Sequence, residues 1–112
     1  MTFYGERYKE RKIFIERRIV KNSEIIARKT SVKNKLGMHA RPASKIARLA
    51  ESAQNDVWLC VDSARVDATS IIDILTLCAV KGTEIVVEVE SQDDMAVLDQ
   101  IVDFFEAGFG EM

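Results

Sequence analysis

The spacing of apolar residues changes several times along this chain, and these changes constrain the fold more than any other feature of the sequence. Alternating or β-branched apolar stretches predict short strands, and apolar residues three or four positions apart predict helices. The expected strands are 26–32, 56–61, 65–67 and 84–90. The expected helices are 40–54, 71–77 and a last helix that begins at 91–94 and ends before Gly108. This order, β-α-β-β-α-β-α, predicts a two-layer sandwich in which helices cover one face of a small sheet.

Two of the predicted helices carry an apolar stripe that we expect to face the core. In the first helix, charged residues take the side opposite the stripe. The stripe of the first helix contains Ala43, Ile46, Ala47, Ala50 and Ala53. The expected core positions of the last helix are Met95, Val97, Leu98, Ile101, Val102, Phe104 and Phe105. Gly108 and Gly110 then end this helix.

The first 24 residues differ in charge from the rest of the chain. They carry seven Lys or Arg and four Glu, a net charge of +3, whereas the remaining 88 residues carry nine basic and fourteen acidic groups, a net charge of −5. The acidic main part argues against a nucleic-acid partner. We therefore predict a charged extension at 1–24 and a main domain at 25–112, with a polar boundary at 21–23. Within the extension the apolar period is ambiguous, and the spacing of Ile15 and Ile19 favours a helix.

Length and composition narrow the class of protein. A chain of 112 residues forms one ordinary domain, and its hydrophobic content of 47% is near the globular average. The longest apolar stretch, 74–80, is far shorter than the roughly 20 residues that cross a bilayer, and the charged N-terminus lacks the pattern of a secretory signal. We expect a cytoplasmic protein without membrane insertion. Its two cysteines, Cys60 and Cys78, are expected to be buried thiols in a reducing compartment.

The sequence contains a single histidine, His39, at an informative position. It lies where a glycine-containing turn meets the first predicted helix, and Pro42 suits the first turn of a helix because its missing N–H costs little there. His39 is therefore predicted to be the N-cap residue, with its ring at the positive end of the helix. The unpaired N–H groups of the first turn would point outward and could bind an anion.

This position indicates a possible chemistry for His39. The positive helix end and the nearby Arg41 disfavour the imidazolium, so a nucleophilic ring nitrogen stays available at neutral pH. A phosphoryl group on that nitrogen would meet the helix N–H donors and the Arg41 guanidinium. Two other interpretations remain open from the residues alone: His39 could be only a cap, or a solvated loop residue. No metal site is expected, because one histidine and two separated cysteines do not form a ligand set.

Two motifs carry a resemblance to a known family. The segment Gly37-Met38-His39-Ala40-Arg41-Pro42-Ala43 resembles the active-site signature of HPr, the histidine-containing phosphocarrier of the bacterial phosphoenolpyruvate:sugar phosphotransferase system, with Met38 where Leu is usual. Residues 70–77, followed by Lys81-Gly82-Thr83, resemble the family's regulatory-serine helix and the turn after it. The resemblance covers about residues 25–108. It implies an α+β open-faced sandwich, with a four-stranded antiparallel sheet and helices on one face.

The resemblance implies a shuttle rather than a stand-alone enzyme. His39 would accept a phosphoryl group on Nδ1 from phosphorylated enzyme I and pass it to a histidine of an enzyme IIA-type protein. The Arg41 guanidinium and the backbone N–H groups of Ala40 and Arg41 would stabilise the phosphate, and no cofactor is expected. The alternative is a phosphorylation-dependent regulator that binds a transcription factor or a metabolic enzyme. Intact His39, Arg41 and Pro42 favour the carrier.

A carrier needs a surface that several partners can use in turn. We expect weak docking on an apolar patch with a charged rim. The candidate docking residues are Met38, Ala43, Arg48, Ile71, Ile72 and Leu75. At helical spacing Ile71, Ile72 and Leu75 cannot all face inward together with Ile74 and Leu77, so at least Ile71 or Ile72 should be exposed.

A second modification site is implied at Ser70. This residue matches the serine that HPr kinase/phosphorylase modifies in many bacteria, and a phosphate there would add negative charge beside the docking patch. Thr69 stands where a basic residue is common, and Asp73 adds an acid where the family is often basic or small. The other expected role of Ser70 is to cap the helix that begins at 71.

Overall fold

The elements follow the predicted order once two N-terminal strands are added. The computed structural model describes residues 3–8, 13–20 and 23–112. The strands are β1 (Phe3–Tyr8), β2 (Ile13–Val20), β3 (Ser23–Ser31), β4 (Val57–Val61), β5 (Ala64–Asp67) and β6 (Glu84–Val89). The helices are α1 (Ala40–Glu51), α2 (Ile71–Thr76) and α3 (Met95–Glu106), with short 3-10 turns at Gln92–Asp94 and Gly108–Gly110. Every element predicted from residue 26 onward is present close to its expected bounds.

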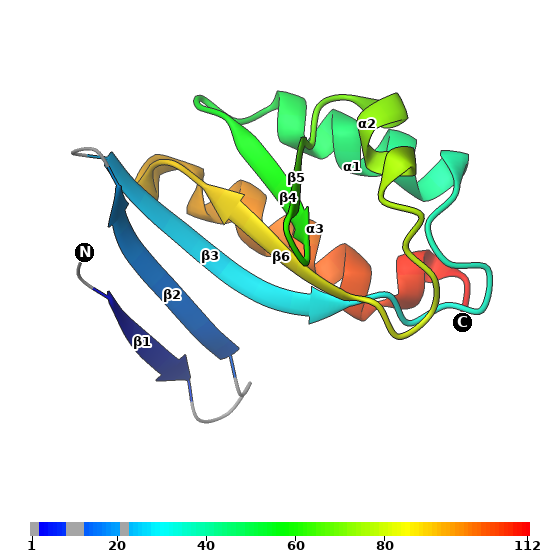
Figure 1. Ribbon diagram of the computed structural model, residues 1–112, viewed down its shortest axis with the longest axis horizontal. Coiled ribbons are helices and arrows are strands. Elements are labelled where there is room, and N and C mark those ends of the chain that lie inside the picture. The colour runs from blue at the N-terminus through cyan, green and yellow to red at the C-terminus, as the bar shows by residue number, and fades with distance from the viewer. Residues whose placement is uncertain (1–2, 9–12, 21–22) are drawn as a thin grey trace.

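The strands form one antiparallel sheet in the order β1-β2-β3-β6-β4-β5. Its last four strands are the antiparallel sheet that was predicted for the main domain. Strand β6 lies inside this group, pairing with β3 through Ile26↔Val89 and with β4 through Val57↔Val89. Figure 1 shows β2 and then β1 continuing the sheet beyond β3, at the edge away from α1 and α2.

The prediction of a helix within residues 1–24 is wrong. The described parts of this segment form strands β1 and β2, and β2 pairs with β3 from Ile15↔Arg28 to Val20↔Ser23. The alternation of Ile13 and Ile15, which competes with the helical spacing of Ile15 and Ile19, predicts the observed state. Pairing with an existing sheet edge satisfies a whole row of backbone N–H and C=O groups. A helix in this segment would depend on packing of an amphipathic face instead.

The core lies between the sheet and the helices, as predicted. On α1 the stripe residues Ala43, Ile46, Ala47 and Ala50 are buried, and Ala53 lies at the margin of the core. On α3 the buried residues are Val97, Leu98, Ile101, Val102 and Phe105, with Met95 and Phe104 partly buried. The Arg28 guanidinium donates to Asp99 Oδ1 at 2.7 Å, and Thr30 Oγ1 donates to Glu106 Oε2 at 2.6 Å. These two contacts hold α3 against β3.

The prediction that both cysteines are buried is wrong. Cys60 is half-buried and Cys78 is exposed, and no disulfide joins them. Cys60 follows the buried Leu59 in β4, and successive residues of a strand point to opposite faces of the sheet. Cys78 lies just after α2 with φ of 50°. An apolar neighbourhood in the sequence therefore does not decide burial here.

The turn that leads into α1 depends on Gly37. This residue has φ of +70°, and a Cβ atom built on it would lie 2.7 Å from the carbonyl oxygen of Ala79. The same oxygen accepts a hydrogen bond from the backbone N–H of Met38 at 2.9 Å. Glycine is therefore required both for the left-handed backbone and for the close approach of the two loops.

We expect Gly37→Ala to lower the free energy of unfolding by about 1–3 kcal/mol, because it adds both backbone strain and a clash. Gly82→Ala is the matched control, since Gly82 also has a positive φ, of +92°, but nothing lies within 4 Å of its added Cβ. Chemical denaturation of both variants measures the difference. Equal losses in the two variants would show that the contact with Ala79 does not matter.

Candidate functional site

The candidate site lies at the beginning of α1. His39 is the N-cap residue of this helix, as predicted, with an extended backbone (φ −141°, ψ −175°). The N–H group of Ala43 donates to the His39 carbonyl at 3.0 Å. The N–H groups of Ala40 and Arg41 belong to the first turn and have no acceptor within the helix. The His39 side chain therefore starts at the positive end of α1.

The imidazole ring contacts the C-terminal segment rather than the helix backbone. The side chain is 35% exposed, makes no capping hydrogen bond, and places Nε2 2.7 Å from Oε2 of Glu111. When Nε2 carries the proton and donates it to this carboxylate, the lone pair of the neutral ring is on Nδ1. Of the two neutral tautomers, the contact thus favours the one whose lone pair is on Nδ1.

Glu111 joins the groups around His39 into one cluster. The Arg41 guanidinium donates to the same Oε2 atom that contacts the imidazole. The Asn34 side-chain amide donates to Glu111 Oε1 at 2.6 Å and to the Gly37 carbonyl at 3.0 Å. One carboxylate therefore positions the ring, the guanidinium and the loop that precedes α1.

The charge of Glu111 is stabilised by its neighbours. Burial raises the pKa of Glu111, but hydrogen bonds from His39 and Asn34 and the positive charges of Arg41 and His39 outweigh burial, so the pKa lies below its ordinary value of 4.5. The carboxylate is therefore ionised at neutral pH. It supplies a negative counter-charge to Arg41 beside the histidine.

A C-terminal turn brings Glu111 to this place, and Figure 1 shows the C-terminus beside the loop between β3 and α1. Phe109 is buried, and its ring centroid lies 5.0 Å from those of Phe104 and Phe105. Gly108 and Gly110 have positive φ and end α3, as predicted. No sequence pattern indicated Glu111, which lies 72 residues from His39. The available hint was an apolar anchor, Phe109, between two glycines.

The predicted docking residues lie at different depths. Ile71 and Ile72 are 39% and 75% exposed, which confirms that at least one of them faces solvent. Arg48 is also exposed, whereas Met38 and Leu75 are half-buried against the core. The predicted docking residues therefore include exposed side chains and half-buried side chains that pack against the core.

The assignment of Ala43 to the docking surface is wrong. Ala43 is fully buried, because it belongs to the inner stripe of α1. Two exposed apolar residues were not predicted: Leu36 is 75% exposed and Val80 is 66% exposed. They come from two loops that meet at Gly37. Both lie outside regular helices and strands, so no periodic pattern could identify them.

Ser70 is the N-cap residue of α2, which confirms its expected capping role. Its Oγ accepts a hydrogen bond from the N–H of Asp73 at 3.2 Å, and its own N–H donates to the Asp67 carbonyl at 3.1 Å. The side chain of Asp73 lies in the first turn of α2. Ser70 is half-buried and directly precedes the exposed Ile71 and Ile72.

Two kinds of feature are not found in residues 3–8, 13–20 and 23–112. No three His, Cys, Asp or Glu side chains in these ranges are grouped so that they could hold a metal ion. Within the same ranges, every helix is too short or too polar to cross a membrane.

The arrangement at α1 is suited to hold a phosphoryl group. It combines a partly exposed imidazole, an adjacent guanidinium and free N–H groups at a helix end, all of which can meet phosphate oxygens. The site opens on the surface at the end of an open-faced sandwich. This fold, with such an arrangement at the start of a helix, is typical of a small phosphocarrier domain.

Comparison with known proteins supports this class. Residues 26–107 match the family model described as the PTS HPr component phosphorylation site. The chain is 41% identical over 81 residues to phosphocarrier protein HPr of Chlamydia pneumoniae, covering 72% of this chain and 75% of that protein. It is 38% identical over 85 residues to phosphocarrier protein NPr of Proteus mirabilis, covering 75% and 94%. The crystal structure of HPr-C-His from Thermoanaerobacter tengcongensis matches with a TM-score of 0.71 at 31% identity, covering 77% of this chain and 97% of that one.

The chain belongs to the HPr family of phosphocarriers of the phosphotransferase system, as the sequence motifs indicated. The family match begins at residue 26, inside β3. Strands β1 and β2 therefore lie outside the matched region.

We expect the cluster around Glu111 to lose stability in acid. The pKa of Glu111 is lower in the folded chain than its ordinary value of 4.5, so its contribution is fully present above pH 4.5. The contribution is lost as the pH falls through the folded pKa. Glu111→Gln should therefore flatten this part of the curve of unfolding free energy against pH.

Chemical denaturation at a series of acidic pH values measures this effect. Glu51→Gln is the control, because it removes an exposed carboxylate at the opposite end of α1. An unchanged curve in Glu111→Gln would show that His39, Asn34 and Arg41 do not stabilise the ionised carboxylate.

Proposed function

We propose that His39 accepts a phosphoryl group on Nδ1 from phosphorylated enzyme I and transfers it to a histidine of an enzyme IIA-type protein in the cytoplasm. One observation carries the proposal: Nε2 of His39 contacts Glu111, and of the two neutral tautomers this contact favours the one with its lone pair on Nδ1. Membership of a phosphocarrier family gives the class of reaction.

Each transfer replaces one nitrogen–phosphorus bond by another. The Nδ1 lone pair of His39 attacks the phosphorus of the donor phosphohistidine, and the donor's nitrogen–phosphorus bond breaks, returning its electron pair to the donor ring. Nε2 keeps its proton and its hydrogen bond to Glu111, which stabilises the positive charge that develops on the ring. The second transfer follows the same steps in reverse, with the acceptor histidine as nucleophile.

Arg41 is placed to exchange one anion for another. In the structure its guanidinium pairs with Glu111, and its side chain is 62% exposed, so it can move without disturbing the core. A phosphoryl group on Nδ1 would offer oxygens that match the two-pronged guanidinium. The N–H groups of Ala40 and Arg41 would supply further donors. Catalysis by this chain is then mainly positioning and neutralisation of charge.

The docking surface would consist of the exposed apolar residues of α2, of the loop between β3 and α1, and of the loop between α2 and β6. Ile71, Ile72, Leu36 and Val80 offer apolar contact, and Arg48 offers a charged rim. A few exposed side chains of this kind suit a transient complex, in which each partner must leave after transfer. The docking partners enzyme I and enzyme IIA would therefore use the same surface in turn.

We expect enzyme I and phosphoenolpyruvate to add one acid-labile phosphate to the chain. The phosphate should be absent in His39→Ala, and in Arg41→Ala it should form at least about tenfold more slowly, because one charge-assisted contact is lost. Lys29→Ala, which removes an exposed cation from β3, is the matched control and should react at the normal rate. Intact mass and phosphorus NMR measure the product. Failure of the unmodified chain to be labelled by an active enzyme I would overturn the carrier role.

Regulation at Ser70 is the second part of the proposal. A phosphate on Ser70 would add about −1.5 to −2 charge beside Ile71 and Ile72 and near the Asp73 carboxylate. HPr kinase/phosphorylase with ATP should therefore add an acid-stable phosphate, and the modified chain should accept phosphate from enzyme I more slowly. Ser70→Ala should abolish this labelling, whereas Ser91→Ala, which removes another capping serine, should not. Labelling that survives Ser70→Ala would exclude this site.

A further inference from the structure

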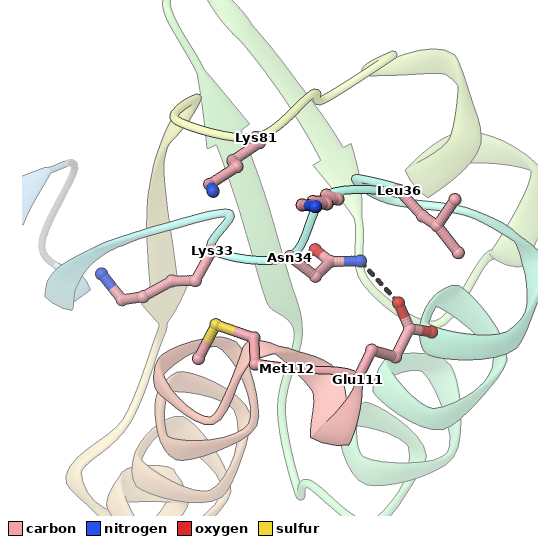
Figure 2. Close-up of a pocket in the computed structure, with 7 residues that line it drawn as sticks. Lys33, Asn34, Leu36, Lys81, Glu111 and Met112 are labelled. Carbon is pink, nitrogen blue, oxygen red and sulfur yellow. Dashed lines mark hydrogen bonds between the residues drawn. The ribbon is translucent and has the colours of Figure 1, made fainter.

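The groups joined by Glu111, namely His39, Arg41 and Asn34, form what we call the His39 cluster. Beside this cluster lies a pocket of about 440 Å³ that the phosphoryl-transfer steps do not use (Figure 2). Its wall includes Lys33, Asn34 and Lys35 from the loop after β3 and Lys81 from the loop before β6. Leu36 and Met112 add apolar surface, and Glu111 separates the pocket from His39. Volumes of roughly 300–1,000 Å³ are typical of sites for small molecules.

The wall of the pocket is rich in positive charge. The Lys33 ammonium already has partners, since it donates to Ser31 Oγ at 2.9 Å and lies 3.7 Å from Glu106 Oε1. Lys35 and Lys81 are exposed and have neither a hydrogen bond nor an ion pair within the described part of the chain. The negative charge of Glu111 is already balanced by Arg41. The pocket therefore favours an anion.

Asn34 gives the pocket a second, neutral feature. This residue is 2% exposed, and its Nδ2 group donates to both Gly37 and Glu111. Its Oδ1 atom is buried and accepts no hydrogen bond from any described residue. Figure 2 shows the amide nitrogen directed at Glu111 and the oxygen directed away from it. A buried carbonyl without a donor is unfavourable, so a molecule that brings a hydroxyl group to it gains a hydrogen bond.

We propose that this pocket binds a small phosphorylated polyol. Its phosphate lies between the Lys35 and Lys81 ammonium groups, and a hydroxyl donates to Asn34 Oδ1. Because Oδ1 is covered, the hydroxyl reaches it after a small movement of the wall. Charge alone would admit any anion, but the buried acceptor selects one that also carries a hydrogen-bond donor.

The pocket and the His39 cluster share Glu111. Its Oε1 accepts from Asn34, which faces the pocket, and its Oε2 contacts His39. A ligand that changes the hydrogen bonding of Asn34 therefore also changes the surroundings of the imidazole. Binding should be visible both at the Asn34 amide and at the His39 ring.

The test is an NMR titration of the unphosphorylated full chain with glycerol 3-phosphate at constant ionic strength. We expect saturable shifts of the Asn34 side-chain amide, the Lys81 backbone amide and the His39 ring. The double variant Lys35→Ala/Lys81→Ala should bind at least about tenfold more weakly, because it removes both ammonium contacts. Lys29→Ala, which removes an exposed lysine outside the pocket, should bind normally.

Inorganic phosphate and glycerol are titrated in parallel. The proposal is supported if inorganic phosphate and glycerol each bind more weakly than glycerol 3-phosphate. If inorganic phosphate binds as tightly as glycerol 3-phosphate, the proposed hydrogen bond between the ligand hydroxyl and Asn34 is overturned. Absence of saturable shifts, or equal weakening by Lys29→Ala and the double variant, overturns the site itself. These outcomes do not depend on phosphorylation of His39, so they are separate from the test of the carrier role.

Discussion

One carboxylate, that of Glu111, holds together the groups on which the site depends. It contacts Nε2 of His39, accepts from the Arg41 guanidinium, and accepts from the Asn34 amide. Without this anion, Arg41 and Nε2 of His39 would each lose the partner that the structure gives them. The structure thus shows the Arg41 guanidinium paired with an internal anion beside the imidazole.

Contacts between distant segments of the chain place these groups. His39 comes from the beginning of α1, and the contact between Gly37 and Ala79 fixes the turn before it. The C-terminal turn is anchored by the buried Phe109, which packs against α3. Three separate loops therefore meet at one end of the sandwich, and each is fixed by contacts that do not involve the His39 ring.

The sequence was sufficient for features with a local cause. Helical stripes and strand alternation predicted the elements from residue 26 onward, and Pro42 after a glycine turn predicted His39 as the N-cap residue. Features with a long-range cause were missed or wrong. Glu111 reaches the site through a tertiary contact, and β2 is a strand because it pairs with β3. Ala43 fits both the apolar stripe of the first helix and the expected docking residues, and its full burial in the core excludes the docking role.

The N-terminal hairpin changes where the sheet ends. In the region that matches the family, β3 would have one side of its backbone unpaired, but here β2 occupies that side and β1 follows it. The free row of N–H and C=O groups is therefore displaced by two strand spacings, roughly 10 Å, from β3. A binding partner that adds a strand to this edge of the sheet would pair with β1, which lies outside the segment that matches the family.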